Sequence, residues 1–126
     1  MLKNSLLVAE DNPDTRYFYS YVLKQAGFDV RLVKDGYGTL EELQRQRPDI
    51  LLLDMMMPGM TGLEVIEHIQ EKAEWKDLPV VVISAYLDDI DNNLKGVTKL
   101  IKKPIEANCL VSTLLDVAIK ESSLEV

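Results

Sequence analysis

The chain has 126 residues, of which 47% are hydrophobic and 28% charged, values typical of one soluble globular domain, predicted here to span residues 1–126. Its formal net charge of −7 argues against direct binding to nucleic acid or to an anionic membrane, because both present negative phosphate groups. The chain has no apolar run long enough to cross a bilayer, no signal peptide and a single cysteine, Cys109, so we predict a cytoplasmic protein.

The N-terminal half of the chain predicts strands and helices in alternation. An apolar run at 6–9 is the first predicted strand, and the acidic pair Glu10-Asp11 follows it. Asn12 and Pro13 favour a helix start, because Asn caps helices and Pro suits their first position. The next predicted elements are a helix at 13–26 with Phe18, Tyr21, Val22 and Gln25 at helical spacing, a strand at 28–33, a turn at 34–36 and a helix at 39–46.

The C-terminal half continues the alternation. Pro48 precedes an apolar strand, and Thr61 is a candidate helix cap. Asp and Asn are poor helix formers, so the Asp- and Asn-rich stretch at 88–96 is predicted to form only a short or irregular helix. The predicted elements are a strand at 49–53, a helix at 62–72, a strand at 80–83, the helix at 88–96, a strand at 98–101 and a helix at 106–120.

The central predicted strands are continuous apolar runs, ILLL and VVVI. Such strands are buried on both faces, as in a parallel sheet covered by helices. We therefore predict an α/β fold with three layers, doubly wound around a five-stranded parallel sheet. Ligands of these folds bind beyond the carboxyl ends of the strands.

Chemically active side chains follow four of the predicted strands. They are Glu10-Asp11 after the first strand, Asp54 after the third, Ser84-Ala85 after the fourth and Lys102-Lys103-Pro104 after the fifth. Neighbouring carboxylates repel one another, and Mg²⁺ with its preference for oxygen ligands relieves that repulsion. A lysine and a hydroxyl beside such a metal suit phosphoryl transfer, in which a carboxylate at a strand end is the nucleophile. The glycines and Pro58 after Asp54 allow the sharp turn that leaves this carboxylate accessible.

These motifs, each at the end of its own strand, closely resemble the receiver domain of two-component response regulators over the whole chain. The matching residues are Glu10-Asp11, Asp54 with Met57-Pro58 and Gly62, Ser84-Ala85, and Lys103-Pro104. The resemblance implies a flavodoxin-like (βα)5 fold with strand order 2-1-3-4-5, as in chemotaxis-type single receivers. It also implies a cytoplasmic signalling protein that accepts a phosphoryl group from a histidine kinase or phosphotransfer protein, rather than an enzyme.

The resemblance assigns roles to individual residues. Asp54 is the implied phosphoacceptor. Glu10, Asp11 and Asp54 are implied to bind Mg²⁺, or Mn²⁺ in its place, together with the backbone carbonyl of Met56. Ser84 and Lys103 are implied to contact the phosphoryl group, and the Lys103-Pro104 peptide bond is implied to be cis.

Two further positions carry expectations about lifetime and output. Met56 and Tyr86 match the positions that tune spontaneous dephosphorylation, and their bulk predicts a long-lived phosphoryl group. Leu100 stands where the family usually has an aromatic switch residue, and the stretch from Ser84 to Lys103 is shorter than usual by close to one helical turn. The face formed by 88–96, 98–101 and 106–120, which in this family binds downstream partners and supports dimers, is therefore predicted to differ from the usual one.

Two other functions remain to be distinguished. A Mg²⁺-dependent phosphohydrolase with an aspartyl nucleophile needs a second acid near the nucleophile, commonly two residues on, but position 56 is methionine. A receiver-like domain that only binds partners would be expected to lack an acid or the lysine, and all are present. A free-standing receiver and a receiver cut from a longer regulator or hybrid kinase both fit the sequence, because no output domain follows the last predicted helix.

Several residues are better explained by structure than by function. Met55, Met56, Met57 and Met60 are predicted to pack the loop, because no Cys or His accompanies them as a soft-metal ligand. His68 is predicted on the polar side of its helix and Trp75 in the packed loop before Pro79. Cys109 is predicted to face the core or a partner and to be inert.

Overall fold

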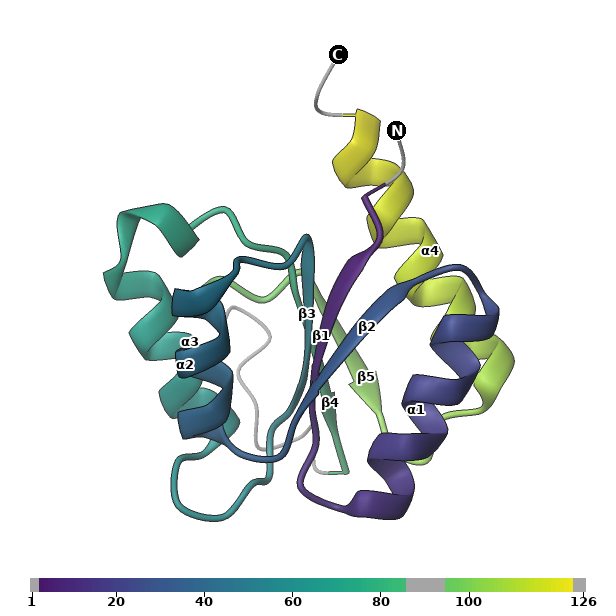
Figure 1. Ribbon diagram of the computed structural model, residues 1–126, viewed down its shortest axis with the longest axis horizontal. Helices are drawn as coiled ribbons and strands as arrows, with labels where there is room; N and C mark the ends of the chain where they lie inside the picture. The colour runs from purple at the N-terminus through teal and green to yellow at the C-terminus, as the bar shows by residue number, and fades with distance from the viewer. Residues whose placement is uncertain (1–2, 86–94, 124–126) are drawn as a thin grey trace.

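The computed structural model describes residues 3–85 and 95–123, which form a five-stranded parallel sheet in the order β2-β1-β3-β4-β5. Helices α1 and α4 cover one face, and α2 and α3 cover the other (Figure 1). The elements are β1 (Ser5–Ala9), α1 (Pro13–Gln25), β2 (Asp29–Val33), α2 (Gly36–Arg45), β3 (Ile50–Asp54), α3 (Gly62–Glu71), the 3₁₀ helix η1 (Ala73–Trp75), β4 (Val80–Ser84), β5 (Lys99–Lys102) and α4 (Ala107–Ser123). The predicted fold class and strand order are confirmed.

The sheet separates two hydrophobic cores, because side chains alternate between its faces. Leu7 and Leu53 pack with α2 and α3, whereas Leu6 and Leu52 pack with α1 and α4. Every residue of β3 and of β4 is buried, as the continuous apolar runs predicted.

Parallel pairing brings the carboxyl ends of the strands to one edge of the sheet, the lower edge in Figure 1. Ala9 of β1 is paired with Leu53 of β3, so the residues that follow them, Glu10 and Asp54, lie side by side. Ser84 is paired with Lys102, which places Lys103 one residue further along the same edge. The register alone therefore gathers the predicted site residues.

The residues whose spacing predicted α1 are not the ones that the helix buries. Phe18 and Tyr21 are 45% and 68% exposed, and the buried residues are Tyr19, Ser20 and Leu23. Tyr19 and Leu23 are four residues apart and lie on one stripe of the helix, which packs against β-sheet residues and α4.

The start of α2 was also predicted too late. Residues 34–36, predicted as a turn, contain the N-cap Asp35, whose carboxylate accepts a hydrogen bond of 2.6 Å from the Gly38 N–H, and α2 begins at Gly36. Thr61 caps α3 as predicted, through a capping box with Glu64. The boundaries of β5 and α4 lie within three residues of the predicted ones.

The helix predicted at 88–96 falls largely outside the described residues, and so does Tyr86. Among the helices that the structure does describe, none combines the length and the hydrophobicity that a membrane span needs.

Candidate functional site

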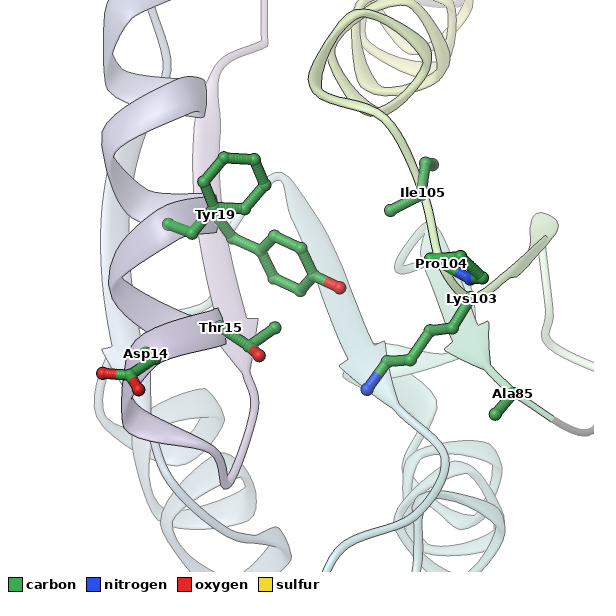
Figure 2. Close-up of a pocket in the computed structure, with 8 residues that line it drawn as sticks. Asp14, Thr15, Tyr19, Ala85, Lys103, Pro104 and Ile105 are labelled. Atoms are coloured by element: carbon green, nitrogen blue, oxygen red, sulfur yellow. The ribbon is translucent and has the colours of Figure 1, made fainter.

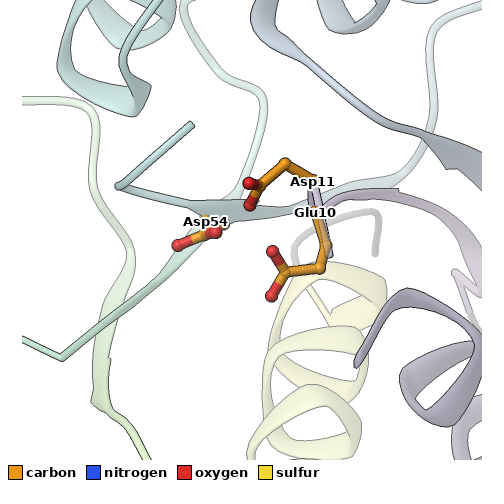
Figure 3. Close-up of side chains that lie close together, drawn as sticks. All are labelled: Glu10, Asp11 and Asp54. Atoms are coloured by element: carbon orange, nitrogen blue, oxygen red, sulfur yellow. The ribbon is translucent and has the colours of Figure 1, made fainter. Parts of the chain in front are cut away.

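Three carboxylates meet at the lower edge of the sheet: Glu10, Asp11 and Asp54, called the acid cluster below. Each offers one oxygen, and these oxygens lie within 4.8 Å of one another (Figure 3). Glu10 and Asp54 are 1% and 4% exposed, whereas Asp11 is accessible to solvent. The prediction that the turn after β3 leaves the Asp54 carboxylate accessible is therefore wrong, because the surrounding loops and Lys103 cover it. The sequence predicted that these three acids converge, because they stand at the end of one buried strand or just after the end of another.

Lys103 supplies the positive charge that the cluster needs. Its Nζ lies 3.0 Å from Glu10 Oε1 and 3.4 Å from Asp54 Oδ1. The Lys103 N–H donates to the Ser84 carbonyl oxygen at 2.8 Å, and the Lys103-Pro104 bond is cis, as predicted. Glu10 and Lys103 lie 93 residues apart in the chain, so it is the sheet register that brings this pair together.

The loop after β3 turns back onto the strand end, and this requires glycine. A Cβ on Gly62 would lie 2.7 Å from Met55 Cα and 2.8 Å from the Asp54 carbonyl oxygen, too close for any side chain. Gly59 has φ +79°, in the left-handed region that glycine adopts without strain. The Met56 N–H donates to Asp54 Oδ1 at 3.2 Å, so the turn also orients the carboxylate.

Arg16 contributes to the site, and the sequence reading missed it. One guanidinium nitrogen donates to the Glu10 carbonyl oxygen at 2.9 Å and to the Asp11 carbonyl oxygen at 3.3 Å. Helical side chains point back toward the helix N-terminus, so an arginine one turn beyond Asn12 was in reach of the preceding loop. Arg16 thus fixes the backbone that carries two members of the acid cluster.

The pKa values of the two buried acids of the cluster are shifted in opposite directions. Burial, together with the neighbouring Glu10, raises the pKa of Asp54 to about 7. Burial acts upward on Glu10 as well, but hydrogen bonds to Asp54 and Lys103 outweigh it and hold the pKa of Glu10 below its usual range. The pKa of Lys103 is raised, because its carboxylate partners outweigh the effect of burial. Below neutral pH, one proton on Asp54 and the ammonium of Lys103 relieve the repulsion.

This arrangement predicts how the metal-free protein responds to pH. A folded-state pKa of about 7 lies above the ordinary 3.8, so the stability that Asp54 contributes is present at low pH and lost as pH rises through 7. We expect the free energy of unfolding in EDTA to fall by about 2 kcal/mol between about pH 5 and pH 8. Urea denaturation across this range measures it, and Asp54→Asn should flatten the curve. A wild-type stability that rises with pH would contradict this.

The acid cluster fits a hard divalent cation. Its donors are all carboxylate oxygens, the ligands that Mg²⁺ and Mn²⁺ prefer, and they converge from two neighbouring strand ends. Met55, Met57 and Met60 are buried in the core beside α2 and α3, in agreement with their predicted packing role. Met56, by contrast, is 58% exposed next to Asp54, so the prediction that it packs the loop is wrong.

The remaining predicted residues have the following places. Ser84 is buried at the end of β4, and Leu100 is half-buried against the core on the α2 and α3 side. His68 is exposed and Trp75 is buried, as predicted. Cys109 was predicted to face the core or a partner; it is exposed, which rules out the core and leaves the partner as a prediction.

Comparison with known proteins points to one family. A profile described as "Response regulator receiver domain" matches residues 6–115. The DNA-binding response regulator MtrA of Mycolicibacterium smegmatis is 31% identical over 88% of this chain and 49% of its own length. The phosphate regulon transcriptional regulatory protein PhoB of Escherichia coli is 32% identical over 96% of this chain and 54% of its own length. The chain spans about half the length of these curated relatives.

Solved structures agree on the fold. The chemotaxis response regulator CheY4 of Vibrio cholerae superposes with a TM-score of 0.84 at 26% identity, covering 90% of this chain and 98% of that one. The signal receiver domain of a Luxo repressor protein from Vibrio parahaemolyticus has a TM-score of 0.86, with 98% and 96% of the two chains covered. At 22% identity, this second likeness concerns the fold alone.

Proposed function

Because this chain belongs to the response regulator receiver family, whose members are signalling domains rather than conventional enzymes, we propose that Asp54 is its phosphoacceptor and that phosphorylation depends on Mg²⁺. The single observation that supports this most is the position of Asp54 in the acid cluster, with Lys103 Nζ 3.4 Å from its Oδ1. One carboxylate is thus held beside metal ligands and a cation at the open edge of the sheet.

The proposed reaction moves a phosphoryl group from a phosphohistidine of a sensor histidine kinase or a phosphotransfer protein. An Asp54 oxygen attacks phosphorus, and the P–N bond breaks with its electron pair returning to the imidazole. The Met56 N–H orients the attacking carboxylate. Lys103 and the Ser84 hydroxyl would bind phosphoryl oxygens, since both lie at the same sheet edge. Through these three groups the domain would assist its own phosphorylation and dephosphorylation.

The metal site we propose consists of the side chains of Glu10, Asp11 and Asp54 and the backbone carbonyl of Met56. Bound Mg²⁺, or Mn²⁺, would neutralise charge on the transferred group. Arg16 would keep the backbone of the first two ligands in place through its hydrogen bonds to their carbonyl oxygens.

Phosphorylation is proposed to change which partners bind. Ser84 ends β4, and Leu100 lies on the neighbouring strand β5, where it is paired with Val82. These two residues would connect Asp54 to the surface formed by β5 and α4. Leu100 packs against the core, in the place where the family usually has an aromatic switch residue. A downstream protein, an attached output domain or a second copy of the chain would read the change. The exposed free thiol of Cys109 suits a cytoplasmic location.

Treatment with acetyl phosphate and Mg²⁺, followed by intact mass measurement, tests this proposal. We expect the gain of one phosphoryl group per chain. Repeated turnover of phosphate esters would instead indicate a phosphohydrolase, and an unchanged mass would indicate a domain that only binds partners.

The exposed side chain of Met56 leads to a prediction about lifetime. It stands next to Asp54, so it should hinder attack by water on the aspartyl phosphate. We expect Met56→Ala to accelerate spontaneous dephosphorylation by about three- to tenfold, measured by loss of the phosphoryl group after removal of acetyl phosphate. Leu63→Ala, which also trims an exposed apolar side chain but in the first turn of α3, should leave the rate unchanged. A wild-type half-life of seconds would contradict the prediction.

A further inference from the structure

Beside the acid cluster lies a hollow of about 560 Å³ between α1 and the segment that follows β5. Tyr19 and Lys103 project into it from opposite walls, and the phenol oxygen points toward the lysine side (Figure 2). Pro104 and Ile105 continue the wall that carries the lysine. The hollow thus joins a buried tyrosine of the first helix to the cation of the proposed phosphorylation site.

Tyr19 is unusual among the tyrosines of α1. It is 5% exposed, whereas Tyr17 and Tyr21 are 64% and 68% exposed. Its ring belongs to the core between the sheet, α1 and α4, but its hydroxyl points toward the wall that carries Lys103 (Figure 2). Burial raises the pKa of Tyr19, and the charges of Lys103, Glu10 and Asp54 also act on the phenol. The hydroxyl therefore stays protonated and neutral, able to accept a hydrogen bond as well as donate one.

Metal binding would compete with the two ion pairs of Lys103. Its ammonium is held by Glu10 and Asp54, and both of these carboxylates are also proposed to bind the metal. A divalent cation competes for the same oxygens and repels the ammonium. Lys103 must then release at least one carboxylate, yet it has to stay beside Asp54 to meet the phosphoryl group.

We propose that Tyr19 is a positioning residue, whose hydroxyl accepts a hydrogen bond from the Lys103 ammonium when Glu10 and Asp54 take up the metal. This inference rests on the proposed function, because it assumes the metal site described there. The ammonium has three N–H donors, and a neutral oxygen on the far wall of the hollow replaces an acceptor that the metal has claimed. Tyr19 would thereby lower the cost of metal binding without touching the metal.

Calorimetric titration of the protein with MgCl₂ tests the proposal through a double-mutant cycle. Tyr19→Phe keeps the buried ring and deletes only the hydroxyl. We expect it to weaken Mg²⁺ binding by about three- to tenfold, the scale of one ordinary intramolecular hydrogen bond. Tyr21→Phe, the same change at an exposed position of the same helix, should have no effect. In a Lys103→Met background, Tyr19→Phe should also have no effect, because the donor is absent.

The cycle separates positioning from a merely structural role. An equal loss of affinity in both backgrounds would mean that Tyr19 acts through packing, and unchanged affinity of Tyr19→Phe would also overturn the proposal. If Lys103→Met does not fold, the nitrogen NMR signal of Lys103 Nζ is compared between Tyr19→Phe and wild type, both loaded with Mg²⁺. Its protons should exchange faster with solvent in Tyr19→Phe than in wild type, and equal exchange would overturn the proposal. Wild type that binds no Mg²⁺ and takes no phosphoryl group from acetyl phosphate would instead refute the proposed function itself.

Discussion

Replacement of Asp54 by asparagine is expected to abolish phosphorylation by acetyl phosphate, lowering the rate by more than about 100-fold. Asparagine has nearly the same shape, so it can still accept the hydrogen bond from the Met56 N–H. It cannot, however, supply the anionic oxygen that attacks phosphorus. Intact mass measured over time on wild type and Asp54→Asn in parallel gives the result directly.

Two controls make this loss interpretable. Asp77→Asn changes an exposed acid in the loop before β4, away from the acid cluster, and should be phosphorylated like wild type. Asp54→Asn should remain folded, since asparagine mimics the protonated carboxyl that the raised pKa favours below neutral pH. Phosphorylation of Asp54→Asn at the wild-type rate, or a phosphoryl group mapped to another acid in wild type, would remove Asp54 from its proposed role.

The strands and the edge that carries the site could be predicted, because their signals are local. A buried parallel strand is a continuous apolar run, and the acids after Ala9 and Leu53 mark where such runs stop. Parallel pairing then needs no further information to bring the ends together. The same reasoning placed Ser84 and Lys103 at this edge.

Features that depend on neighbours in space were harder to predict. The inward stripe of α1 is set by what packs against it, and the exposed Phe18 and Tyr21 looked as suitable as the buried Tyr19. Asp35 resembled a turn residue because caps and turns favour the same side chains. The contact of Arg16 with two carbonyl oxygens has no sequence signature beyond its distance from the helix cap.

The structure also changes how the acid cluster is understood. The sequence does not tell which of the three carboxylates are buried or which of them pair with the lysine. In the folded chain, Glu10 and Asp54 are buried and share Lys103, while Asp11 is accessible to solvent. Changes to the two buried acids therefore alter both stability and metal binding, since a buried charge that loses its partner is costly. Asp11 offers a cleaner way to test the metal site.

Replacement of Asp11 by asparagine is accordingly expected to weaken Mg²⁺ binding at least tenfold while leaving the unfolding temperature in EDTA close to that of wild type. The substitution removes one of three anionic ligands but keeps the backbone carbonyl that Arg16 holds. Phosphorylation by acetyl phosphate should slow in proportion at low Mg²⁺ and recover as Mg²⁺ is raised, because Asp54 is intact. Calorimetric titration and phosphorylation rates over a range of Mg²⁺ concentrations measure the two effects.

The matched control for this change is Asp14→Asn, an exposed acid in the first turn of α1 that is not part of the acid cluster. Both substitutions remove one negative charge from the same region, so a general electrostatic effect would weaken Mg²⁺ binding in both variants alike. A loss confined to Asp11→Asn identifies a ligand, since only direct coordination depends on which of two nearby charges is removed. Equal affinity in Asp11→Asn and wild type would mean that the metal does not bind where these carboxylates converge.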